Sequence, residues 1–135
     1  LEGKTDPERS IGLASYGVDD WPYATIAVDG KVALSGGEFS ILYLDQKHRG
    51  IYKIPYDAIT PRRGQCENLL VPVCCSASHI AMTSLRTEPV WMILGESAGT
   101  AAAIATRESM SVQDVAYNKL REKLLALGQR LERPA

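Results

Sequence analysis

The chain has 135 residues, of which 45% are hydrophobic and 23% charged, and its formal net charge at pH 7 is -1. This length suits one ordinary globular core and is too short for two. The basic residues are scattered except for Arg62-Arg63, which argues against a concentrated positive surface for nucleic acid or an anionic membrane. No apolar run reaches the roughly 20 residues that cross a bilayer. We therefore expect neither a nucleic-acid partner nor a membrane one.

The three cysteines do not form a recognisable metal or disulfide pattern. Cys66, Cys74 and Cys75 are an odd number without a C-x-x-C spacing, which argues against a disulfide framework and a structural zinc site. We expect no metal, and we expect the cysteines to fill small apolar spaces, with a redox role for the adjacent pair as the alternative.

The first half of the chain predicts antiparallel strands. Runs of β-branched and apolar residues at 25–28 and 31–34 flank Asp29-Gly30, a dipeptide typical of a type I′ hairpin turn. The runs 38–44 and 50–54 are also rich in β-branched and aromatic residues and are bounded by turn formers. We expect three or four antiparallel strands, followed by a turn or single helical turn between Pro55 and Pro61.

A buried strand and a close-packed helix are expected next. Residues 68–74 form a nearly continuous apolar run, typical of a strand covered on both faces, although Pro72 lacks the N–H that would continue the pairing. Pro89 opens a helix over about 90–105. Small residues at spacings of three and four on one side of this helix would allow a close approach to a sheet, a helix or a ligand. They are Gly95, Ala98, Gly99, Ala102 and Ala103.

A last helix is expected to cover a flank of the core. Asp114 is the predicted N-cap, residues 115–127 form the helix, and Gly128 ends it. Leucines at helical spacing give this segment one apolar face.

Several long motifs from Ile54 onward resemble a known family. The resemblance is to the closing segments of FAD-dependent oxidoreductases of the kind labelled xanthan-lyase-like. The motifs that carry it extend over about 80 residues. The motifs are Ile54-Pro55-Tyr56, CENLLVPV at 66–73, SASHIA at 76–81, SLRTEPVWMILG at 84–95 and SAGTAA at 97–102.

The resemblance implies a mixed α/β fold and a two-domain flavoenzyme. Residues 1–60 would be a β-rich, antiparallel segment of the substrate domain. Residues 61–135 would be the C-terminal portion of a Rossmann-type FAD-binding domain, built as a strand followed by two helices. It further implies that the loop 76–88 passes beside the flavin and that the helix after Pro89 points its amino terminus at the ring. That end carries unpaired N–H groups and about half a positive charge, which suits negative charge on a reduced flavin.

The same resemblance assigns the candidate site residues. His79 and Arg86 would be catalytic, as an acid or base and as a polar contact to cofactor or substrate. The cofactor contacts would be Ser76, Ser78, Ser84, Glu88, Pro89 and Val90. Two plainer interpretations stay open: Arg86 as the surface ion-pair partner of Glu88, and His79 as a hydrogen-bonded structural residue.

Some positions depart from the pattern of the family. The chain contains no strand-to-helix G-x-G-x-x-G motif, which is where such proteins hold the ADP portion of FAD. We therefore expect this chain alone not to bind FAD tightly and to be inactive as an enzyme. Asp57 stands where an arginine is usual, and Glu96 where a glutamine is common.

The resulting hypothesis is the C-terminal part of an enzyme that moves a hydride between FAD and a small hydroxylated or carbohydrate-like substrate. The alternative is a non-enzymatic binding module that has lost FAD, and a third interpretation is a polysaccharide (xanthan) lyase-type protein. The apolar faces at 69–73 and on the Gly95 helix also predict self-association.

Overall fold

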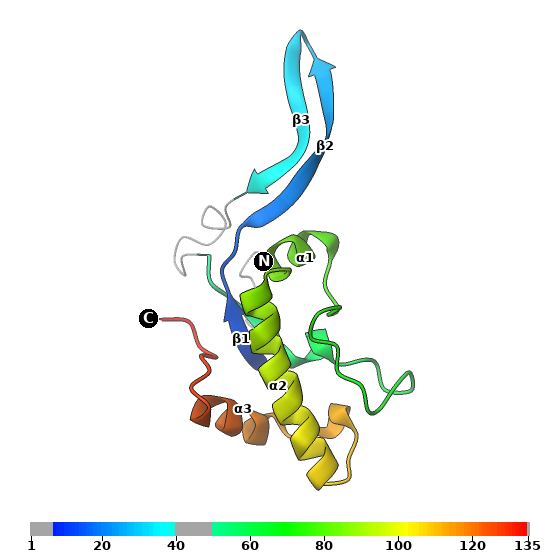
Figure 1. The fold of residues 1–135 in the computed structure, drawn as a ribbon, viewed down its shortest axis with the longest axis vertical. Helices are drawn as coiled ribbons and strands as arrows, with labels where there is room; N and C mark the ends of the chain where they lie inside the picture. The colour runs from blue at the N-terminus through cyan, green and yellow to red at the C-terminus, as the bar shows by residue number, and fades with distance from the viewer. Residues whose placement is uncertain (1–6, 40–49, 135) are drawn as a thin grey trace.

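The computed structural model describes residues 7–39 and 50–134, which form a mixed α/β fold of short antiparallel strands and helices, as the sequence predicts (Figure 1). The strands pair as two separate two-stranded sheets, one of β1 with β4 and one of β2 with β3. In chain order the elements are β1 (Ser10–Ala14), β2 (Val18–Val28), β3 (Lys31–Phe39), β4 (Tyr52–Pro55), the 3-10 helix η2 (Tyr56–Ile59), α1 (His79–Leu85), α2 (Glu88–Arg107), the 3-10 helix η3 (Val112–Asp114) and α3 (Tyr117–Ala126).

β2 and β3 form a long hairpin that extends away from the rest of the molecule (Figure 1). Val28 pairs with Lys31 across the turn, and the two turn residues Asp29 and Gly30 have φ of 51° and 73°. Positive φ at both central positions is the signature of a type I′ turn, so the hairpin prediction is confirmed. The expected strand at 38–44 begins at the end of β3, and its remaining residues lie outside the described part of the chain.

β1 was not anticipated from the sequence, yet it joins the two halves of the core. It pairs antiparallel with β4, and Gly12 lies opposite Ile54. α2 packs across β1 at close range: a Cβ added to Gly12 would come within 2.5 Å of Ile93 Cγ2. The Ser97 hydroxyl of α2 donates to the carbonyl of Ile11 at 2.8 Å. Gly12 therefore allows the close packing of strand and helix.

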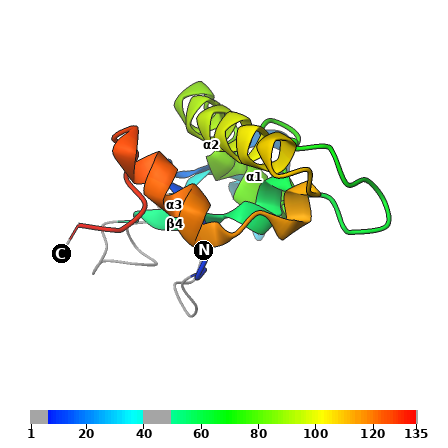
Figure 2. The ribbon, with the colours of Figure 1, turned by 90° about the horizontal axis from the view of Figure 1, so that it is seen from below.

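One hydrophobic cluster runs from the strands through α2 to α3. Ile11, Ile54, Leu94, Leu120 and Leu124 are essentially inaccessible to solvent. Figure 2 shows α2 and α3 side by side, with β4 beneath them. The short turn between Pro55 and Pro61 is the single helical turn η2, as expected.

The strand predicted at 68–74 is wrong. This segment is extended and irregular, and Val71 donates its N–H to the carbonyl of Ile59 at 2.9 Å. A strand needs at least one partner strand along its edge, and none of the described strands pairs with this segment. Leu69 and Val73 are consequently half exposed.

The expectation that the cysteines fill small apolar spaces holds for Cys75. Cys75 is buried in the core cluster and Cys74 is exposed, and all three cysteines, which lie in the described part, are free thiols. Burial raises the pKa of the Cys75 thiol, which makes it less reactive.

The last helix begins later than predicted. Ala116 is its N-cap, while the carboxylate of Asp114 accepts hydrogen bonds from Arg63 and Ser111. Gly128 has a φ of 87° just after the helix, so the predicted stop is right. On α2, the predicted small-residue side is only partly covered: Ala98 is buried, while Gly99 is exposed and has open space around it among the described residues.

Candidate functional site

The expected cofactor-side loop at 76–88 contains a short helix, α1, that lies beside the amino end of α2 (Figure 1). Ser78 is its N-cap, and the Ser78 hydroxyl accepts a hydrogen bond from the N–H of Ala81 at 3.2 Å. Arg86 ends α1, and Thr87 is the N-cap of α2. A serine three residues before the bonded N–H is a usual start signal for a helix, so this element was within reach of the sequence.

The two candidate catalytic residues lie at opposite ends of α1. His79 is the first residue of the helix and is exposed, whereas Arg86 follows its last residue. The seven residues of α1 span about 10 Å along the helix axis, so the backbone positions of His79 and Arg86 lie about that far apart.

Arg86 forms an ion pair with an acidic residue of the hairpin. Its Nη2 lies 2.5 Å from Asp19 Oδ2, and the two side chains are 49% and 32% exposed. The interpretation of Arg86 as the partner of Glu88 is therefore wrong, and the contact joins positions 67 residues apart in sequence. No local pattern in the sequence could identify this partner.

Ser84 lies inside the protein. It is fully buried, its hydroxyl donates to the Tyr16 carbonyl at 2.5 Å, and it is 2.6 Å from the Tyr52 hydroxyl. Because a serine has one proton to donate, the Tyr52 hydroxyl is the donor to Ser84 Oγ. Burial raises the pKa of Tyr52, which keeps this hydroxyl protonated as a donor. The pair ties β4, α1 and the segment before β2 together.

Ser76 lies where two hollows meet. Its backbone N–H donates to the carbonyl of Ala58 at 2.6 Å, and its side chain is exposed. One hollow, of about 180 Å³, is mainly apolar and lies between β4 and α1, with Tyr52 and Leu85 among its walls. The other is polar and lies on the side of η2 and η3. Ser76 could therefore contact a ligand from either side.

The amino end of α2 has one unpaired hydrogen-bond donor, the N–H of Glu88, among the described residues. Glu88 and Pro89 are exposed at this end and Val90 is buried. The N–H groups of Val90 and Trp91 both point to the carbonyl of Thr87, at 3.0 and 3.1 Å, and the Thr87 side chain makes no capping bond. Within residues 7–39 and 50–134, the N–H of Glu88 has no acceptor. This helix end can thus receive an acceptor or partial negative charge from a ligand.

Two further features bear on ligands. The described residues contain no group of three or more histidine, cysteine or acidic side chains arranged to hold a metal ion, and no helix among them is long and apolar enough to span a membrane. The buried indole Nε1 of Trp91, one turn inside α2, has no hydrogen-bond partner among residues 7–39 and 50–134. An orphaned donor near an uncapped helix end fits a site completed by a group from outside the described chain.

Comparison with known families finds one match. The model of the FAD dependent oxidoreductase family matches residues 1–124. No curated protein and no solved structure matches the chain. The xanthan-lyase-like kind of oxidoreductase stays a prediction. FAD is the cofactor of the family, and the unpaired Glu88 N–H at the amino end of α2 fits the carbonyl-bearing edge of its ring.

Proposed function

This chain belongs to the FAD dependent oxidoreductase family, and on that basis we propose that it lines the flavin-ring side of an enzyme acting on a hydroxylated or carbohydrate-like substrate. The observation that carries this proposal is the uncapped amino end of α2 beside α1. FAD supplies the hydride-transfer chemistry when it is bound, and the protein orients it.

The residues at this end would take separate roles. The backbone of Glu88, Pro89 and Val90 would form the wall against the ring, with the Glu88 N–H as a donor. Ser76 and Ser78 would contribute hydroxyls on the α1 side, and Ser84 would support the site by holding Tyr52. These assignments rest on the resemblance of this segment to the family.

His79 and Arg86 would act on the substrate side. The imidazole of His79, an exposed residue, would serve as an acid or base, and the guanidinium of Arg86 is a hydrogen-bond donor whose charge Asp19 partly offsets. The G-x-G-x-x-G motif that holds the ADP portion is not in these 135 residues. We propose that another segment of the same protein supplies it.

Flavin retention tests the proposal. The complete open reading frame that contains these residues is expressed, and its visible spectrum is compared with that of the 135-residue chain. We expect the two absorbance bands of oxidised flavin in the longer protein and little or none in the chain alone. Absence of flavin from both would contradict the proposal and favour a binding module without FAD.

The role of the helix end has a sharper test. Replacing Glu88 with Gln removes a negative charge from the first turn of α2, and Glu96→Gln removes one from an exposed site about 12 Å further along the helix. That distance exceeds the roughly 8 Å screening length at physiological salt. We expect Glu88→Gln to raise the flavin midpoint potential by roughly 20 mV, about 1 kcal/mol for two electrons. Equal shifts in both variants would show that α2 does not point at the ring.

A further inference from the structure

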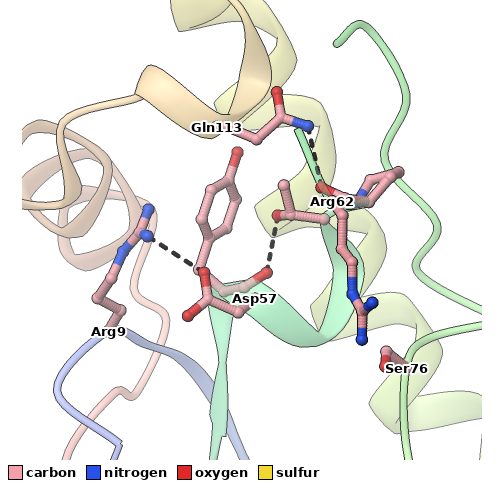
Figure 3. Close-up of a pocket in the computed structure, with 8 residues that line it drawn as sticks. Arg9, Asp57, Arg62, Ser76 and Gln113 are labelled. Atoms are coloured by element: carbon pink, nitrogen blue, oxygen red, sulfur yellow. Dashed lines mark hydrogen bonds and ion pairs between the residues drawn. The ribbon is translucent and has the colours of Figure 1, made fainter. Parts of the chain in front are cut away.

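A polar hollow of about 320 Å³ opens beside η2, and Ser76 is one of the residues that line it (Figure 3). Its size is at the lower end of the range for small-molecule sites. The residues that give it chemical character are Arg9, Tyr56, Asp57, Arg62, Ser76 and Gln113. They come from five places in the chain: the segment before β1, η2, the basic loop after it, the segment before α1, and η3.

The walls of this hollow are fixed by hydrogen bonds. The hydroxyl of the fully buried Tyr56 donates to the carbonyl of Val112 at 2.8 Å. The side-chain amide of Gln113 donates to the carbonyls of Pro61 and Cys66, at 3.0 and 2.8 Å. These bonds clamp both ends of the loop that carries Arg62, so the opening is held in place by the fold.

The charged groups around the hollow are not balanced. Arg9 Nη1 lies 3.1 Å from Asp57 Oδ1, and its guanidinium also stacks over the Tyr56 ring, 4.9 Å from the centroid. The charges of Arg9 and Asp57 therefore offset each other. Arg62 has no ion pair or hydrogen bond to any residue of the described chain, and in Figure 3 its guanidinium extends toward Ser76. The hollow thus keeps one unpaired positive charge.

The unused polar groups are mainly donors. The N–H groups of Arg62 have no acceptor, and the Ser76 hydroxyl makes no side-chain hydrogen bond within the described residues. Arg9 uses one of its nitrogens for Asp57 and keeps others. A planar guanidinium with a neighbouring hydroxyl matches the two oxygens of a carboxylate or a phosphate.

We propose that this hollow binds the anionic oxygen group, a carboxylate or a phosphate, of a small ligand through Arg62, with Ser76 as second donor. The same chemistry serves an acidic sugar and a sugar phosphate. The site requires no flavin, so its test and the flavin test can fail independently.

Titration calorimetry of the 135-residue chain at low ionic strength tests this site with three probes. D-glucuronate carries a carboxylate, D-glucose 6-phosphate carries a phosphate, and neutral D-glucose is the reference. We expect at least one of the two anions to bind and glucose not to bind. The ratio of the two anion affinities identifies which group the site prefers.

A pair of adjacent arginines supplies the matched control. Arg62→Gln should weaken anion binding by about tenfold or more, since a charged hydrogen bond is lost. Arg63→Gln removes the same charge one residue away, where the side chain pairs with Asp114 outside the hollow, and should change binding by less than about twofold from long-range charge alone.

Asp57→Asn gives a change in the opposite direction. Removing the carboxylate releases Arg9 and adds a second unpaired positive charge, so anion binding should tighten several-fold. Circular dichroism checks that each variant is folded. The proposal is overturned if neither anion binds, if Arg62→Gln and Arg63→Gln weaken binding equally, or if Asp57→Asn weakens it.

Discussion

The buried Ser84 hydroxyl provides the strongest test of how the segment around α1 is held. Replacing Ser84 with Ala removes a donor to the Tyr16 carbonyl and the acceptor of the Tyr52 hydroxyl. Each neutral hydrogen bond contributes about 1 kcal/mol, and leaving the buried Tyr52 hydroxyl unpaired adds a desolvation cost. We expect Ser84→Ala to lower the free energy of unfolding by about 2–3 kcal/mol.

A double-mutant cycle separates the two bonds. Tyr52→Phe removes one bond and leaves Ser84 bonded to the Tyr16 carbonyl, so it should cost about 1 kcal/mol. With Ser84 already replaced, Tyr52→Phe removes the unpaired hydroxyl and should cost nothing or regain up to about 1 kcal/mol, which gives a coupling of about 1–2 kcal/mol. Urea denaturation followed by circular dichroism measures these values, and an unchanged m-value confirms that only stability has changed.

Ser76→Ala is the control for this cycle. The Ser76 hydroxyl is exposed and makes no side-chain bond in the described chain, so its loss should change stability by less than about 0.5 kcal/mol. If Ser84→Ala costs no more than Ser76→Ala, or if the cycle shows no coupling, Ser84 does not hold Tyr52 as the geometry requires.

The structure supports three further predictions, and each is checked by denaturation. Gly12→Ala should destabilise by about 1–3 kcal/mol because its Cβ would overlap a side chain of α2, whereas Gly99→Ala, in open space on a helix, should stabilise by up to about 1 kcal/mol. Burial raises the pKa of Tyr52 above 10.0. The contribution of Tyr52 to the free energy of unfolding is therefore complete below pH 10 and is lost as pH rises through the folded-state pKa. Tyr52→Phe should reduce this loss of stability at alkaline pH. The hydrogen bond from Arg63 lowers the pKa of Asp114 from 3.8 to about 2. The contribution of Asp114 to the free energy of unfolding is therefore present above pH 3.8 and is lost as pH falls through about 2. Asp114→Asn should remove this dependence of stability on acid pH.

Elements set by local chemistry could be predicted from the sequence. The turn at Asp29-Gly30 depends on two adjacent residues that tolerate positive φ, and the helix after Pro89 depends on proline placement and periodicity. The stop at Gly128 is likewise a one-residue effect.

Elements that depend on a partner far away in the sequence could not be predicted. β1 is five residues long and exists because β4 lies beside it, about forty residues later in the chain. The apolar run at 68–74 shows the converse. Its composition favours a strand, but no described strand pairs with it. The pairs of Asp19 with Arg86 and of Arg9 with Asp57 also join distant segments. The residue types of the candidate site were therefore readable, while their partners were not.

The two sides of α2 connect stability to the proposed function. One side packs Leu94 and Ala98 into the core, and the other presents Gly99 to open space among the described residues. A glycine on an exposed helix surface costs stability, and Gly99 makes no close contact with the described residues that would offset this cost. It is explained if another part of the flavoprotein approaches that side closely. On this reasoning Gly99→Ala should stabilise the 135-residue chain and yet reduce flavin retention in the complete protein, and a gain in both would show that nothing packs there.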